Sequence, residues 1–98
     1  MVSKHHDLKA DPDVFEASLA GNKPWEIRRN DRNFKVGDRV TLRETFHTGA
    51  EMEEGESLAY TGRKIGGVIS YVMHGPSYGL IHGWVIFTYS NGGSTDGE

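Results

Sequence analysis

The sequence predicts a single mainly β domain of the α+β type, a small β-barrel of about five strands with one or two flanking helices. Three observations lead to this fold class. The chain has 98 residues, which is enough for one hydrophobic core and no more. Short segments that alternate apolar and polar residues recur between turn residues. Only one segment combines helical spacing with signals for both helix ends.

A strand followed by this helix is expected at the start of the chain. Lys4 to Lys9 has the pattern of a short strand. Asp11-Pro12-Asp13 then supplies an N-cap, a proline at the first helical position and an acid in the first turn. Gly21 stands where a left-handed residue ends a helix, so we expect the helix to run from Pro12 to Ala20.

The residues after the helix alternate apolar and charged side chains, which is the period of a half-buried strand. We expect Trp25 and Ile27 to face the core. Glu26 and Arg28 then share the opposite face, within reach of one another or of a common ligand.

The middle of the chain predicts a turn, a strand and a loop. Asn30-Asp31-Arg32-Asn33 is rich in turn formers, and Arg32 is a candidate for contact with a phosphate. Arg39 to Phe46 has strand alternation. Thr48 to Ser57 contains two glycines and four glutamates, so we expect an exposed, mobile loop.

Two further strands and a tail complete the predicted fold. Arg63 to Met73 is rich in strand-forming residues, and Gly66-Gly67 within it indicates the sharp bend that closes small barrels. His82 to Tyr89 is the last and most apolar strand, with Trp84 in the core. Residues 90–98 have the composition of a disordered tail.

Composition limits the classes of function. There is no cysteine, which excludes thiol catalysis, zinc–thiolate sites and a disulfide framework. No apolar stretch is long enough to span a bilayer, and the first residues lack a signal-peptide core, so we expect a cytoplasmic domain at residues 4–89. The formal charge is −3, yet residues 21–45 carry seven basic against four acidic residues, which indicates a local anion site.

The segment Gly21-Asn22-Lys23-Pro24-Trp25-Glu26-Ile27-Arg28 resembles the Gly-x-Lys-x-x-Glu-x-Arg signature of ASCH (activating signal cointegrator homology) domains, relatives of the RNA-binding PUA fold. The resemblance covers most of residues 4–89, apart from the loop at 46–59. It implies a PUA-like β-barrel with a cleft that receives RNA, a nucleotide or a modified base. Five more segments are similar to a small ASCH-related subfamily of unknown function, common in phages and bacteria: His6-Asp7-Leu8-Lys9, Phe15-Glu16-Ala17, Arg28-Arg29-Asn30-Asp31-Arg32, Phe34-Lys35-Val36-Gly37-Asp38 and Tyr60-Thr61-Gly62-Arg63.

The three charged residues of the signature are chemically suited to a nucleotide. The ammonium of Lys23 can meet a phosphate or carbonyl oxygen, and Glu26 can accept hydrogen bonds from a base edge or a ribose hydroxyl. The fork of Arg28 suits a phosphate, a guanine edge or the plane of a base. The structural alternative is an exposed ion pair on a strand face, worth about 0–1 kcal/mol.

The resemblance places the segment of His6 and Lys9 beside the signature strand, so either residue can line the same cleft. Period two puts His6 on the face of Leu8 and not of Lys9, and a buried structural histidine is the alternative. Adjacent strand residues point to opposite faces, so His5-His6-Asp7 does not predict a metal site. We expect neither a metal nor a cofactor.

Non-catalytic binding of RNA or a modified nucleotide is therefore the predicted function. The resemblance also implies an alternative, because some bacterial ASCH proteins are small amidohydrolases that act on N4-acetylcytidine with a lysine, a threonine and a glutamate. Lys23 matches that lysine as base or nucleophile, and Glu26 would be the other catalytic residue. However, Glu26 stands where the threonine belongs, and residues 59–89 contain no Asp or Glu. A third reading is a phage protein that acts on a host factor.

Overall fold

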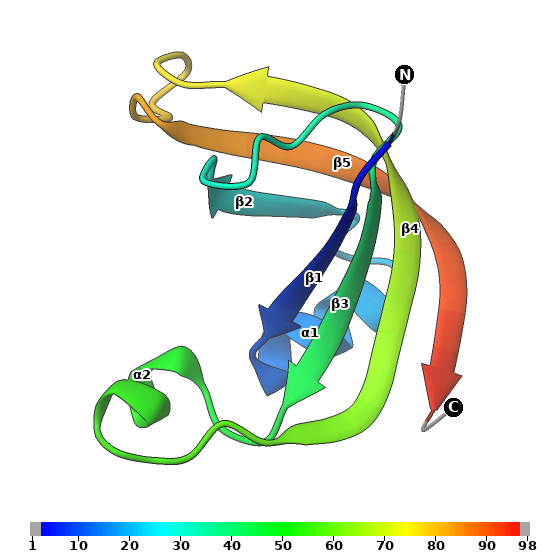
Figure 1. The fold of residues 1–98 in the computed structure, drawn as a ribbon, viewed down its shortest axis with the longest axis vertical. Helices are drawn as coiled ribbons and strands as arrows, with labels where there is room; N and C mark the ends of the chain where they lie inside the picture. The colour runs from blue at the N-terminus through cyan, green and yellow to red at the C-terminus, as the bar shows by residue number, and fades with distance from the viewer. Residues whose placement is uncertain (1–2, 97–98) are drawn as a thin grey trace.

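The computed structural model describes residues 3–96 of the protein. The chain forms one five-stranded mixed sheet that curls into a half-barrel, with strand order β1-β3-β4-β5-β2 (Figure 1). The mainly β class and the number of strands are as predicted. The strands are β1 (His5–Ala10), β2 (Trp25–Arg29), β3 (Arg39–Thr45), β4 (Tyr60–His74) and β5 (Trp84–Asp96), and the helices are α1 (Pro12–Leu19) and α2 (Gly49–Glu53).

The sheet leaves two free edges that face each other across an open seam. β1 pairs in parallel with β3, and the other neighbouring strands pair antiparallel. β1 and β2 stand at opposite ends of the strand order and share no backbone ladder. The curl of the long strands β4 and β5 brings these two edges toward the same side of the molecule (Figure 1). The barrel is therefore open between β1 and β2.

The hydrophobic core fills the concave side of the half-barrel. Strand alternation places the apolar residues of β1, β3, β4 and β5 on this side, and β1 follows a strict exposed–buried pattern. α1 packs across one end and inserts Phe15, which is completely buried. The buried apolar residues are Leu8, Ala10, Phe15, Phe34, Val40, Leu42, Ile65, Ile69, Val85, Phe87 and Tyr89.

The helix α1 ends as the sequence predicts. Ala20 is its C-cap, and Gly21 has φ +81°, the left-handed conformation that glycine adopts without strain. At the other end Asp11 is the N-cap residue, but its side chain caps no amide of α1. Asp11 Oδ1 instead accepts a hydrogen bond of 3.0 Å from the backbone N–H of Gly49. Neither helix of the described chain is long and apolar enough to cross a bilayer.

The segment 48–57 is exposed as predicted, but it contains the short helix α2 where we expected a mobile loop. Thr48 Oγ1 accepts a hydrogen bond from the N–H of Glu51 at 3.1 Å, and the Thr48 N–H donates to Glu51 Oε1 at 2.8 Å. This reciprocal capping box satisfies two helix-end amides that would otherwise lack partners. The Thr-x-x-Glu spacing is its signal in the sequence.

The last strand is longer than the sequence predicts. β5 continues past Tyr89, and residues 94–96 pair with residues 63–65 of β4. Within the segment expected as a tail, residues 90–98, the structure therefore continues the strand as far as Asp96, because the 15-residue strand β4 supplies backbone partners. Residues 97 and 98 lie outside the described part of the chain.

Gly67 provides the bend that the glycine pair predicts. The register of β4 and β5 shifts between Ile65 and Gly67, which marks a bulge. A Cβ at Gly67 would lie 2.3 Å from the carbonyl oxygen of Ser90, whereas a Cβ at Gly66 would come no closer than 4.0 Å to Val40. Gly67 thus allows a close approach between the backbones of two strands.

We expect Gly67→Ala to lower the free energy of unfolding by about 1–3 kcal/mol, because β5 must move to accept the methyl group. The matched variant Gly66→Ala should change it by less than about 0.5 kcal/mol. Urea denaturation followed by circular dichroism measures both. Equal losses in the two variants would contradict the close approach.

Two buried carboxylates tie the sheet to its flanking segments. Asp38 accepts hydrogen bonds from His6 Nε2 at 2.8 Å and from the backbone N–H groups of Lys4 and Lys35, both at 3.1 Å. Burial on its own raises the pKa of Asp38, but these bonds outweigh it, so the pKa lies below its ordinary value. His6 is therefore the buried structural histidine that strand period allowed as an alternative.

The second carboxylate, Glu44, anchors α1 through Arg63. Arg63 Nε donates to Glu44 Oε1 at 2.9 Å, and Arg63 Nη2 bonds Glu16 of α1. The guanidinium of Arg63 also lies 5.0 Å from the centre of the Phe15 ring. The hydrogen bond from Arg63 lowers the pKa of Glu44, against a smaller opposite effect of burial, and Thr61 contributes another bond.

Both pKa values are lower in the folded chain than in an unfolded one, so their stabilisation is present above about pH 4 and is lost as the pH falls through the folded values. We expect Glu44→Gln to be less stable than wild type at pH 7. The difference in free energy of unfolding between the two chains should become smaller below about pH 4. Unfolding curves at several pH values test this. Glu53→Gln, on the exposed helix α2, is the control and should show no such narrowing.

Candidate functional site

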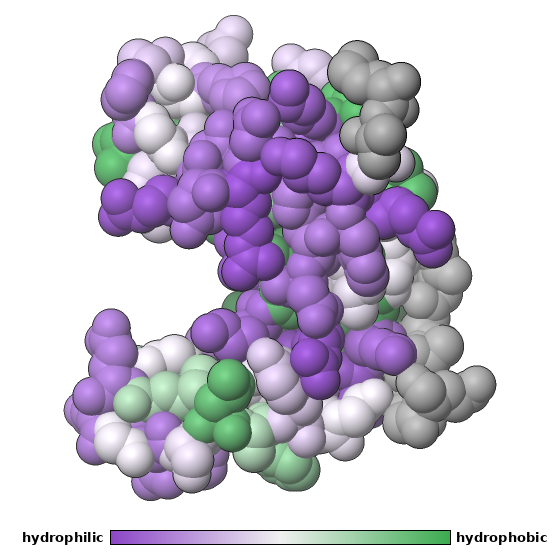
Figure 2. All heavy atoms as spheres, viewed as in Figure 1, coloured by the Kyte–Doolittle hydropathy of each residue, from purple (hydrophilic) through white to green (hydrophobic). Residues whose placement is uncertain are grey.

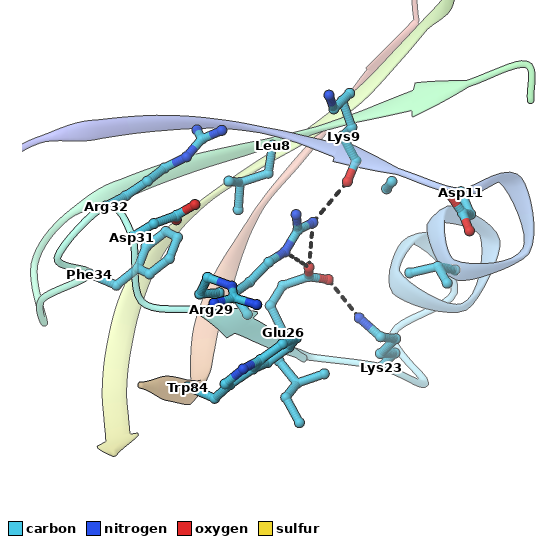
Figure 3. A pocket seen from close by; sticks show the side chains of 14 residues that line it. Leu8, Lys9, Asp11, Lys23, Glu26, Arg29, Asp31, Arg32, Phe34 and Trp84 are labelled. Atoms are coloured by element: carbon cyan, nitrogen blue, oxygen red, sulfur yellow. Dashed lines mark hydrogen bonds and ion pairs between the residues drawn. The ribbon is translucent and has the colours of Figure 1, made fainter. Parts of the chain in front are cut away.

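A hollow of about 490 Å³ lies at the open seam of the half-barrel, and we name it the seam pocket (Figure 3). β1 and the start of α1 form one wall, and β2 with the turn after it forms the other. Five basic and three acidic residues line it, together with an apolar floor. The lining residues are Leu8, Lys9, Ala10, Asp11, Val14, Lys23, Glu26, Ile27, Arg28, Arg29, Asp31, Arg32, Phe34 and Trp84.

The three charged residues of the signature meet in this pocket around the carboxylate of Glu26, as the ion pairs of Glu26 with Lys23 and Arg28 show (Figure 3). Glu26 is only 2% exposed. Lys23 Nζ lies 2.6 Å from Glu26 Oε2. Arg28 Nε lies 2.9 Å and Arg28 Nη2 2.8 Å from Glu26 Oε1. The trio is thus a network of one buried carboxylate and two half-buried cations in a concave site, and the alternative of an exposed ion pair does not describe it.

Local structure explains how Lys23 reaches Glu26. The left-handed Gly21 turns the chain out of α1, and the N–H groups of Asn22 and Lys23 both donate to the carbonyl of Ala17. This holds Lys23 at the junction of helix and strand. Its Nζ also donates to the carbonyl of Trp25 at 2.8 Å, which fixes the side chain over the start of β2.

The predicted orientation of β2 is wrong. Trp25 and Ile27 are 38% and 47% exposed, while Glu26 between them is buried. β2 is an edge strand, and its inner face meets the polar seam pocket as well as the core. Two cations compensate the charge of Glu26 there, which a buried carboxylate requires. The alternating pattern correctly divided the side chains of β2 between two faces, but the face that we expected to be buried is the exposed one.

Neither tryptophan lies in the apolar core, contrary to expectation. Lys23 Nζ lies 4.7 Å from the centre of the Trp25 ring, on the exposed side of β2. Trp84 is partly buried and pairs with Arg29 in the register of β2 and β5. The guanidinium of Arg29 lies 5.6 Å from the centre of the Trp84 ring. Arg29 and Trp84 line the seam pocket, whereas Trp25 does not.

Two arginines bridge the seam by binding the free edge of β1. Arg28 Nη2 donates to the carbonyl of Lys9 at 2.8 Å, and Arg32 Nη1 donates to the carbonyl of Asp7 at 2.7 Å. Carbonyls of an edge strand lack ladder partners, and these two bonds supply them. Arg28 therefore belongs both to the network of Glu26 and to the junction of β1 with β2.

The remaining predicted site residues separate into two groups. Arg32 lines the seam pocket, with one guanidinium nitrogen bound to β1. Lys9 contributes its carbonyl, but strand alternation places its side chain with His5 on the outer face of β1. His6 does not line the pocket, because its side chain is buried against Asp38.

Sequence reasoning missed several residues of the pocket. Arg29, Asp31 and Asp11 add charge to its walls, and Phe34 closes its floor. Phe34 is 2% exposed, and its ring centre lies 4.6 Å from that of His6. The basic run at residues 21–45 was the available signal for Arg29. Within residues 3–96 no group of three or more His, Asp or Glu side chains is placed to hold a metal ion.

The network leaves hydrogen-bond donors free for a ligand. Lys23 uses two of its three protons, on Glu26 and on the Trp25 carbonyl. Arg28 uses Nε and Nη2, and no acceptor among the described residues binds its Nη1. Glu26, in contrast, already accepts from both cations. The site therefore offers donors and positive charge to a ligand that carries acceptors.

We expect Arg28→Ala to lower the free energy of unfolding by about 2–4 kcal/mol, because it leaves Glu26 buried with one partner and the Lys9 carbonyl with none. Adding Glu26→Gln in the same chain should restore roughly half of this loss, since the uncompensated charge is removed. Arg29→Ala, at the exposed rim, is the control and should cost less than about 1 kcal/mol. Denaturant titration of the four chains measures these values. A single variant Arg28→Ala as stable as wild type would contradict the bridging role.

Two comparisons relate the chain to known proteins. Residues 5–89 match the family model described as "Domain of unknown function (DUF3850)". The chain is also 32% identical over 65 residues to an uncharacterized 12.9 kDa protein in the GpA 3' region of Escherichia phage P2. That match covers 66% of this chain and half of the phage protein. Because the family model covers most of the chain, from residue 5 to residue 89, the chain belongs to the DUF3850 family.

Proposed function

We propose that the chain is an ASCH-like, PUA-related domain that binds RNA or a nucleotide in the seam pocket without catalysis. The observation that carries this proposal is the convergence of Lys23, Glu26 and Arg28 in one concave site. These are the three charged positions of the ASCH signature. A curled β half-barrel with a helix across one end is consistent with the same relationship.

The chemistry of the pocket favours a ligand that combines a phosphate with a flat apolar part. The free donors of Lys23 and Arg28 suit a phosphate or a base carbonyl oxygen. Leu8 and Phe34 supply an apolar floor. The volume of about 490 Å³ lies in the ordinary range for small-molecule sites. A nucleotide meets these requirements better than an inorganic anion, which would leave the floor uncovered.

Glu26 is then a positioning residue. The sequence had suggested instead that Glu26 accepts hydrogen bonds from the ligand. Its two oxygens already accept from Lys23 and Arg28. Its part in binding is to hold both cations at fixed places with reduced freedom. Such preorganisation lowers the entropy that a ligand has to remove on binding.

The same contacts favour binding over the amidohydrolase alternative. Lys23 donates hydrogen bonds to Glu26 and to the Trp25 carbonyl, which is the role of an ammonium group. An amine that acts as base or nucleophile needs a free lone pair. Glu26, engaged by two cations, is not available as a proton donor.

The direct test is the binding of uridine monophosphate measured by isothermal titration calorimetry. We expect Lys23→Gln to weaken binding roughly tenfold or more, because a charge-assisted contact is lost while the glutamine can still donate to the Trp25 carbonyl. Lys35→Gln removes the same charge from an exposed turn outside the pocket and is the matched control. Equal affinities of wild type and Lys23→Gln would overturn the site.

Catalysis is tested separately by incubating the wild-type chain with N4-acetylcytidine and following the release of cytidine. We expect no release. Turnover that is present in wild type and absent in Lys23→Gln would replace the binding proposal by the amidohydrolase.

A further inference from the structure

The outer surface of the sheet carries a second group of basic side chains, on the other side of β1 from the seam pocket. We name it the outer basic face. It faces the viewer in Figure 2, where a hydrophilic surface covers β1 and β3. Its basic residues come from β1, β3 and β4 and are His5, Lys9, Arg39, Arg43 and Lys64, and Thr41 and Tyr60 lie among them.

Strand register aligns three of these cations in one row. Lys9 of β1 is the partner of Arg43 of β3, and Arg43 is the partner of Lys64 of β4. Neighbouring strands lie about 4.8 Å apart, so the three side chains leave the sheet side by side. A second cation of β3, Arg39, is the register partner of His5 on the same face.

This row is unfavourable for the folded chain alone. Like charges at directly opposite positions of neighbouring strands destabilise a sheet. The carboxylate on this face that approaches the row is Asp7, and its contact with Arg43 is long, at 3.5 Å between Oδ2 and Nη1. The whole chain, moreover, has more acidic than basic residues. The position of the cations is thus better explained by an anionic partner than by folding.

Arg43 is also held in a preformed orientation. Its guanidinium carbon lies 3.6 Å from the centre of the Tyr60 ring, so the two planes are in close contact. His5 Nε2 and Thr41 Oγ1 are hydrogen-bonded at 2.7 Å beside it. An aromatic ring, a guanidinium and a hydroxyl on an open sheet face are the groups that bind sugar, phosphate and base of a single strand.

The surface around this row is hollowed. A depression of about 490 Å³ is lined by His5, Asp7, Thr41, Arg43, Tyr60, Gly62, Arg63 and Lys64. A second one, of about 430 Å³, shares His5 and Thr41 with it and extends over Arg39 and Gly66-Gly67. The glycines add no side chain, so the two depressions form a shallow groove along β3.

We propose that the outer basic face binds the phosphodiester backbone of single-stranded nucleic acid through Lys9, Arg43 and Lys64. The groove takes the strand, and Tyr60 with Arg43 supplies a stacking surface. This site does not depend on the ligand of the seam pocket, because the two surfaces lie on opposite sides of β1. The contribution of the outer basic face to the binding affinity would increase with the length of the bound strand.

The test measures the affinity of a fluorescein-labelled 12-nucleotide oligouridylate by anisotropy at several salt concentrations. The double variant Arg43→Gln/Lys64→Gln should bind roughly tenfold more weakly at about 0.1 M salt, and its salt slope should fall by about 1.4, as expected when two phosphate contacts are lost. Lys4→Gln/Lys35→Gln makes the same change in charge at exposed positions outside the groove and should bind as wild type. Thermal melting verifies that each chain is folded. If the double variant does not fold, the exposed single variant Lys9→Glu takes its place and should also bind the oligonucleotide more weakly than wild type.

The outcomes separate the two sites. Uridine monophosphate should bind Arg43→Gln/Lys64→Gln with the same affinity as wild type, whereas the oligonucleotide should bind this variant more weakly than wild type. If no chain binds the mononucleotide while the loss of oligonucleotide binding remains, the seam pocket fails and the outer face stands. The outer face is overturned if the double variant and Lys9→Glu both bind the oligonucleotide with wild-type affinity and salt slope. It is also overturned as a nucleic-acid site if an oligoglutamate of equal charge competes as well as unlabelled oligouridylate.

Discussion

The buried carboxylate of Glu26 is the interaction on which the arrangement of the seam depends. A half-barrel of this topology leaves the edges of β1 and β2 without a shared ladder, and polar backbone groups at such an edge require partners. Glu26 holds Lys23 and Arg28 in place, and Arg28 carries the connection across to the carbonyl of Lys9. Side chains therefore do at this seam what backbone hydrogen bonds do between the other strands. The carboxylate is tolerated at 2% exposure because two cations and three close contacts compensate its charge.

This arrangement couples stability to the candidate site. The same arginine that joins β2 to β1 also presents a free nitrogen to the pocket, so its removal affects the fold and the ligand together. Lys23 is less constrained by the fold, because it bonds only groups of its own segment. The two cations thus have different main roles: Arg28 connects β2 to β1, and Lys23 faces the proposed ligand. The outer basic face is different, since Arg43 and Lys64 lie away from the seam, and the ion pair given for them among the described residues is the long contact of Arg43 with Asp7.

Similar polar anchors hold the flanking segments onto a small core. Arg63 links Glu44 of β3 to Glu16 of α1 and covers Phe15, and Asp38 joins the start of β1 to the turn before β3. A domain of this size buries a limited apolar area, so charge-assisted bonds at its margins are a substantial part of its stability. They also attach three of the segments around the seam pocket to the sheet. β1, α1 and the turn after β2 are each fixed to the sheet by at least one such bond or by a buried aromatic ring.

The local features of this protein can be predicted from its residues: α1 with its left-handed stop at Gly21, the inward face of β1 with His6 and Leu8, the bend at Gly67, and the nearness of Lys23, Glu26 and Arg28. Each of these follows from caps, turns or strand period over a few residues. Only the assembled sheet shows which face of β2 is buried and that β5 continues to Asp96. Period two defines two faces of a strand but not which one is covered, since that depends on segments distant in the chain. The sheet curls β1 and β2 toward one another, and that contact makes a polar residue the buried one.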